Sequence, residues 1–83
     1  KNYLIQADIS LEEMNDQFDL NLPEEDFDSL GGYIFSTLGR VPANGDKVEL
    51  ETMVMEVTKM ENRRVILIKL TQKDKIDVEN EEE

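Results

Sequence analysis

Carboxylates are the most numerous side chains in this sequence that could do chemistry. They stand next to one another in Glu12–Glu13 and in the run Glu24–Asp26. Paired carboxylates can act as general acid and base, and their oxygen atoms suit Mg²⁺ and Ca²⁺. Both groups lie at positions expected to be exposed, where carboxylates are normally solvated, and no twelve-residue EF-hand loop is present. A weak divalent-cation sensor therefore stays open as an alternative, and acid–base catalysis gains no support.

The residue types that most enzymes use are missing from the chain. Histidine, cysteine and tryptophan are all absent. Their absence removes the usual general base near neutral pH, the thiolate nucleophile and most zinc sites. None of the three serines, Ser10, Ser29 and Ser36, stands in a motif that would supply a base. We predict that this domain is not an enzyme.

The stretch LGRVPANGDKVEL, residues 38–50, is the candidate for a glycine-spaced loop that binds phosphate. Such a loop needs glycines that open a helix, because the helix N-terminus directs N–H groups at the anion. Here Gly39 ends an apolar helical pattern, and Gly45 stands in a turn before a strand pattern. The stretch is interpreted as a connector. Gly31 and Gly32, in the first turn of that helix, leave two interpretations open: close backbone packing, or a ligand contact at the helix N-terminus.

Charge excludes two classes of partner. The chain of 83 residues has 20 acidic and 9 basic side chains, and its net charge is −11. Nucleic-acid backbones and anionic membrane surfaces both require clustered Lys and Arg. No apolar run approaches the ~18–20 residues that cross a membrane. We therefore predict no nucleic acid partner and no direct membrane insertion of this segment.

Hydrophobic periodicity predicts the elements that must position these groups. Helices are predicted at 11–18 and 29–38, and strands at 3–9, 47–50, 52–60 and 63–70. Ser10, and Asp28 or Ser29, are the predicted N-caps of the two helices. Except at Lys69, the run 65–70 is apolar on both faces and so predicts a central strand. The fold class is α+β: a small antiparallel or mixed sheet with two main helices packed on it.

The periodic pattern ends near residue 72. Residues 1–72 are predicted to form one domain, because domains of this size build a single core. Residues 73–83 are rich in carboxylates and poor in apolar side chains, which is typical of an acidic, disordered tail.

Arginines mark the candidate partner-binding surface. Residues 8–28 carry nine acidic side chains and no basic one, whereas six of the nine basic residues lie between 40 and 69. Arg40 follows a predicted helix end, and Arg63 and Arg64 open the last strand. Arg40 could offset the negative end of the helix dipole. Alternatively, the three arginines bind an acidic surface on a neighbouring domain, or the acidic half of a second copy in a homodimer.

The order of elements and the segments DSLGGYIFSTLGRVPANGDKV, MEV and NRRV resemble the transporter-associated domain of the CorC/HlyC family, over about residues 3–72. The resemblance implies a fold related to part of a PCMH-type FAD-binding domain. It also implies a cytoplasmic, non-catalytic regulatory domain of a bacterial inner-membrane protein linked to magnesium and cobalt efflux or named a hemolysin.

Partners and cofactors follow from the same resemblance. The implied partners are the adjacent CBS and membrane domains of one protein. Kinship to FAD-binding domains keeps a flavin or adenine nucleotide as an alternative ligand. The sequence itself offers no pyrophosphate loop and few aromatic side chains to stack a flavin, so no cofactor is expected.

Overall fold

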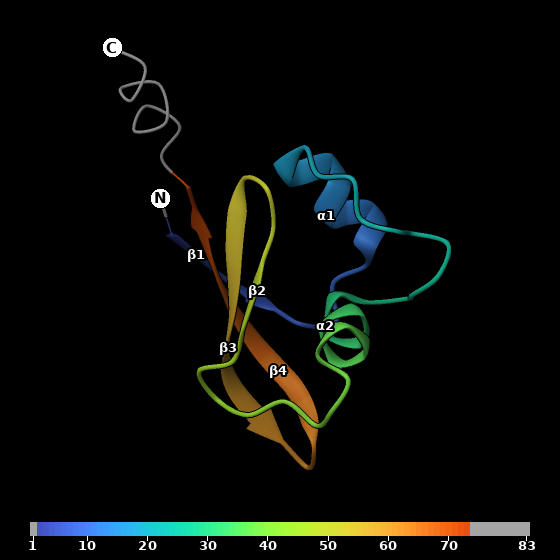
Figure 1. The fold of residues 1–83 in the computed structure, drawn as a ribbon. Coiled ribbons are helices and arrows are strands. Elements are labelled where there is room, and N and C mark those ends of the chain that lie inside the picture. Colours follow the sequence, from blue (N-terminus) through green and yellow to red (C-terminus); the bar gives the residue numbers. More distant parts are fainter. Residues whose placement is uncertain (1, 74–83) are drawn as a thin grey trace.

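Two helices lie against one face of a four-stranded antiparallel sheet (Figure 1). The computed structural model describes residues 2–73. The elements are β1 (Asn2–Gln6), α1 (Leu11–Phe18), α2 (Leu30–Leu38), β2 (Lys47–Glu49), β3 (Met53–Glu61) and β4 (Arg64–Gln72). The strand order is β1-β4-β3-β2. The predicted α+β class is confirmed, and within the described residues every strand pair is antiparallel.

β4 occupies the centre of the sheet, as its two apolar faces predict. It pairs with β1 on one side and with β3 on the other, and Ile68 and Leu70 are fully buried. A two-residue turn joins β3 to β4, and both of its residues, Asn62 (φ 52°) and Arg63 (φ 68°), have left-handed backbones. This geometry is that of a type I′ hairpin. The predicted strand start at Arg63 is therefore wrong by one residue, since Arg63 belongs to the turn.

Local sequence signals set the helix ends. Ser10 caps α1 by accepting a hydrogen bond from the Glu13 N–H at 3.0 Å, and Ser29 caps α2 by accepting one from Gly32 at 3.2 Å. Gly39 ends α2 with a left-handed backbone, as predicted. Asp19 ends α1 in the same conformation, although it carries a side chain.

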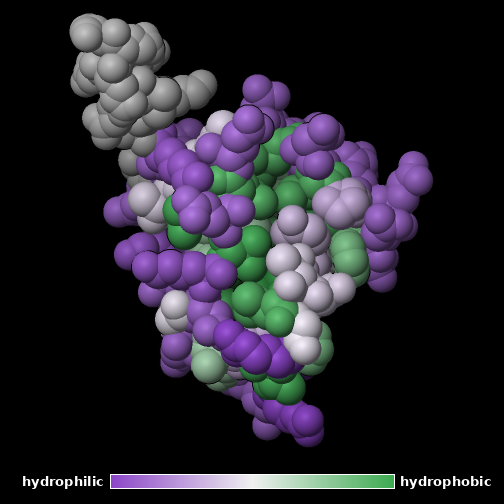
Figure 2. All heavy atoms as spheres, viewed as in Figure 1, coloured by the Kyte–Doolittle hydropathy of each residue, from purple (hydrophilic) through white to green (hydrophobic). Residues whose placement is uncertain are grey.

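The core lies between the sheet and the helices. Its members are Ala7, Leu11, Met14, Leu22, Leu30, Ile34, Val48, Met53, Met55, Val57, Ile68 and Leu70. Among the described residues no polar or charged side chain is buried. In the space-filling view, hydrophobic residues are visible between the sheet and the helices, and hydrophilic residues surround them (Figure 2).

Asn15 fixes the link between the helices. Its side chain accepts a hydrogen bond from the Leu22 N–H at 2.8 Å and donates one to the Leu22 carbonyl at 3.0 Å. It also donates to Glu24 at 2.9 Å. Because the backbone polar groups of Leu22 are satisfied in this way, its side chain can enter the core.

The first turn of α2 meets the chain that follows β1 at very short range. The Leu30 N–H donates to the Ile9 carbonyl, and the Gly31 N–H donates to the Ala7 carbonyl, both at 2.9 Å. A Cβ on Gly31 would lie 3.2 Å from the Ala7 Cβ and 3.3 Å from the Ala7 oxygen. At Gly32 a Cβ would meet only the Ser29 Oγ, at 3.5 Å. The close approach therefore favours glycine at 31, where an added Cβ would be crowded, and places no such demand on 32.

We expect Gly31→Ala to lower the free energy of unfolding by about 1–3 kcal/mol, because overpacking a rigid contact costs that much. This loss outweighs the helix propensity that alanine gains, at most ~1 kcal/mol. Gly32→Ala is the matched control and is expected to be neutral or stabilising. Urea unfolding of both variants measures the difference. Equal effects of the two substitutions would contradict the close approach at Gly31.

Candidate functional site

An open cleft of about 360 Å³ lies between the start of α2 and the β3–β4 hairpin. Its lining residues are Ala7, Asp8, Ser29, Gly31, Gly32, Phe35, Ser36, Arg63, Arg64 and Val65. Phe35 is 40% exposed and is one of three large apolar residues that are exposed in the described part of the chain. The cleft thus combines apolar surface with two cationic side chains.

The first turn of α2 has already used its N–H groups. Those of Leu30 and Gly31 bond to the carbonyl groups of Ile9 and Ala7, and that of Gly32 bonds to the Ser29 Oγ. Helix N-termini bind phosphates through N–H groups that lack a partner. At this helix the geometry favours the packing interpretation of the two glycines over a ligand contact.

Arg63 and Arg64 are brought together at the cleft, as their adjacency in the sequence suggested. Both side chains are exposed. Within residues 2–73, neither makes a hydrogen bond or an ion pair. Asp8 lines the same cleft without pairing to either arginine. The two guanidinium groups are available to bind an external acceptor.

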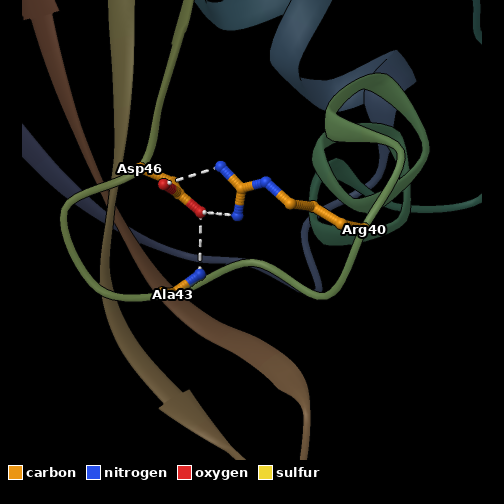
Figure 3. A network of polar contacts seen from close by, with 3 residues as sticks. All are labelled: Arg40, Ala43 and Asp46. Carbon is orange, nitrogen blue, oxygen red and sulfur yellow. Dashed lines mark hydrogen bonds and ion pairs between the residues drawn. The ribbon is translucent and has the colours of Figure 1, made fainter.

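Arg40 lies outside this cleft and binds a carboxylate within its own loop. Its guanidinium donates two hydrogen bonds to Asp46, at 2.7 and 3.1 Å, and the Ala43 N–H donates a third at 2.8 Å (Figure 3). This bidentate pair clamps the connector from α2 to β2. The turn was predicted from the sequence and the clamp was not, because spacing alone does not show which carboxylate an arginine contacts.

The clamp shifts the pKa values of Asp46 and Arg40. The hydrogen bond from Arg40, and next that from the Ala43 N–H, hold the pKa of Asp46 below its ordinary value. The same hydrogen bond and the charge of Asp46 raise the pKa of Arg40. Asp46 therefore stays ionised, and the clamp intact, into mildly acidic solution.

The acidic half of the chain shows a different arrangement. All nine carboxylates between residues 8 and 28 are exposed. In the part of the chain that the structure describes, no three acidic side chains converge to hold a metal ion. No described helix is long and apolar enough to cross a membrane.

Lys73, the first residue of the predicted tail, contacts the domain. The Lys73 N–H donates to the Thr52 carbonyl at 2.9 Å, and its ammonium group pairs with Glu49 at 2.9 Å. Lys73 is thus bound to the β2–β3 hairpin. The remainder of the predicted tail, 74–83, lies outside the described residues, so its disorder stays a prediction.

The chain is similar to CorC-type proteins in both sequence and structure. The family model described as the transporter-associated domain CorC_HlyC matches residues 1–74. The magnesium and cobalt efflux protein CorC of Pasteurella multocida is 29% identical over 98% of this chain, which spans only 28% of the length of that relative.

Solved structures share the fold. A CorC transporter-associated region from Neisseria meningitidis superposes with a TM-score of 0.82 at 27% identity, covering 88% of this chain and 90% of the other. A CorC_HlyC domain from a Xylella fastidiosa hemolysin, in complex with Mg²⁺ and Mn²⁺, has a TM-score of 0.79 at 19% identity, covering 88% and 89%. At that identity the second likeness shows the fold alone.

We expect Asp46→Asn to lower the melting temperature at pH 7, because one acceptor of the bidentate pair is lost. A carboxyl whose pKa is lower in the folded state stabilises the fold above its unfolded pKa, about 3.9, and loses this effect as the pH falls through the folded value. The difference in melting temperature between the variant and the native protein should therefore shrink as the pH falls below about 4. Thermal unfolding across a pH series measures it.

Asp16→Asn is the matched control, because Asp16 has no hydrogen-bond or ion-pair partner among the described residues. Identical pH profiles for the two variants would show that the clamp does not contribute to stability.

Proposed function

The chain belongs to the CorC/HlyC transporter-associated domain family, and we propose that it is a non-catalytic regulatory module that docks through Arg63 and Arg64. Its partners are the adjacent CBS and membrane domains of a bacterial inner-membrane ion-transport protein of the magnesium and cobalt efflux type, and it acts on the cytoplasmic side. The observation that supports docking is the cleft with two unpaired arginines beside an exposed phenylalanine.

The chemistry of these side chains indicates the kind of surface that they bind. A guanidinium group takes a carboxylate through two parallel hydrogen bonds, as Arg40 does with Asp46. Arginine and aromatic side chains are also the residues enriched at the centres of protein interfaces. The partner surface is therefore acidic, with an apolar group that contacts Phe35.

The backbone of Arg63 supports a role for its side chain. A left-handed conformation costs a residue with a Cβ roughly 1–2 kcal/mol, and the second position of a type I′ turn favours glycine. Arg63 has φ 68° at that position. An arginine at a place where glycine would fold more easily is consistent with selection for docking.

Loss of charge at the hairpin should weaken docking. The binding partner in this test is the parent protein without this domain. We expect Arg63→Gln/Arg64→Gln to reduce the affinity of the domain for it by about tenfold or more. Each lost bond to a charged group is worth about 1.5–3 kcal/mol. Titration by light scattering measures the affinity, and rising salt should weaken the native interaction.

Lys47→Gln/Lys59→Gln removes the same charge from β2 and β3 and is the control. Arg63→Gly separates docking from stability: it should weaken binding while leaving the free energy of unfolding unchanged or raising it by up to about 1 kcal/mol. If both glutamine pairs weaken binding equally, the arginines contribute only general charge.

The alternative function, binding of a flavin or an adenine nucleotide, has less support because the N–H groups at the start of α2 are already bonded. We propose that the domain works without either ligand. Addition of FAD or AMP should leave its melting temperature unchanged, since a ligand bound only to the folded state must raise it. A concentration-dependent rise with either compound would favour the alternative.

A further inference from the structure

Both edges of the sheet lack a further partner strand among the described residues, and β1 forms one of them. β1 is the outermost strand next to β4. The Ala7 N–H donates to the Ile66 carbonyl, in register with the β1–β4 pairing. In an antiparallel ladder the residues that bond to a neighbour alternate, so Ile5 bonds inward and Asn2, Leu4 and Gln6 direct their N–H and C=O groups outward.

The two edges of the sheet differ in chemistry. β2, at the opposite edge, has three residues, of which Lys47 and Glu49 are charged and exposed. Short edge strands with charged side chains discourage pairing with another chain. β1 has five residues, NYLIQ, with no charge, proline or glycine. The edge formed by β1 therefore lacks the features that normally prevent strand addition.

Leu4 stands at the middle of this open edge. The residue is 65% exposed, more than Phe35 (40%) or Val41 (39%). Alternation along β1 places Leu4 with Asn2 and Gln6 on the sheet face away from the helices, because Tyr3 and Ile5 pack against the core. A second strand at this edge would cover Leu4 and satisfy the outward backbone groups together.

We propose that β1 pairs with β1 of a second copy of this chain, antiparallel about a two-fold axis at Leu4. In this register Leu4 faces Leu4 of the second copy, and Asn2 faces Gln6 on each side. Amide side chains both donate and accept hydrogen bonds, so Asn2 and Gln6 complement each other. A two-fold interface must be self-complementary in this way. The pairing also brings no charged side chain of β1 against another, although the chain has a net charge of −11.

The expected association is weak for the isolated domain. One pair of short strands buries less than the roughly 1,200–2,000 Å² of a stable interface. Two copies held in one assembly would associate more readily, because tethering raises their effective concentration. The proposal does not depend on docking through Arg63 and Arg64, which lie at the β3–β4 hairpin.

Disulfide trapping tests the register directly, since the chain has no cysteine. Facing residues that share both hydrogen bonds lie ~5.5 Å apart between Cα atoms, within the ~4.4–6.8 Å of a disulfide. Leu4→Cys should therefore form a covalent dimer about ten times faster than Val41→Cys, the control at another exposed apolar position. Equal rates would overturn the proposal.

Sedimentation velocity over a concentration series gives an independent readout. Leu4→Lys places a charge on the edge and should weaken dimerisation about tenfold or more, as expected for a lost leucine contact. Because Leu4 is exposed, the melting temperature of the Leu4→Lys variant should stay close to that of the native chain. Arg63→Gln/Arg64→Gln should leave the dimer unchanged. A dimer that Leu4→Lys does not weaken, or a native chain that stays monomeric while Leu4→Cys reacts no faster than the control, would overturn the proposal.

Discussion

Two hydrogen bonds join the first turn of α2 to the carbonyl groups that follow β1, and the placement of the other elements depends on them. They hold α2 against the sheet, with Leu30 and Ile34 in the core. They favour glycine at 31, since a Cβ there would lie only 3.2 Å from the Ala7 Cβ. They also use the N–H groups that would otherwise make the helix N-terminus an anion site. One local constraint thus stabilises the fold and disfavours a phosphate ligand.

The same junction defines the surface left for binding. With α2 fixed, Phe35 stands exposed beside the β3–β4 hairpin, and the cleft between them has arginines instead of free backbone donors. The three arginines therefore differ in role. Arg40 is bound in the loop before β2, whereas Arg63 and Arg64 have no partner among the described residues. Docking by side-chain charge is consistent with this arrangement.

Most of the fold could be predicted from the sequence because its signals are local. Ser10, Ser29 and Gly39 set helix ends through backbone geometry that depends on a few neighbouring residues. The central position of β4 follows from its apolar run. The first turn of α2 was harder, because sequence alone left both a packing and a ligand interpretation of its glycines.

What the sequence could not show are contacts between residues whose spacing carries no periodic signal. The pairing of Asn15 with Leu22 and that of Arg40 with Asp46 depend on how the connecting loops fold back. The candidate site was found only in part for the same reason. Arg63 and Arg64 were identified by their charge, whereas the exposure of Phe35 beside them became visible only in three dimensions.

The pairing of β1 with β4 has a consequence for synthesis. Asn2 lies opposite Thr71. During synthesis, β1 is therefore made first but cannot pair until β4 has been made. The β3–β4 hairpin is local and can form within microseconds once its residues are free. Closure by β1 is the contact of longest sequence separation, and such contacts slow folding. On the ribosome, therefore, the sheet is completed only after β4 has left the exit tunnel, and until then Leu4 and the neighbouring apolar residues of β1 are exposed to chaperones.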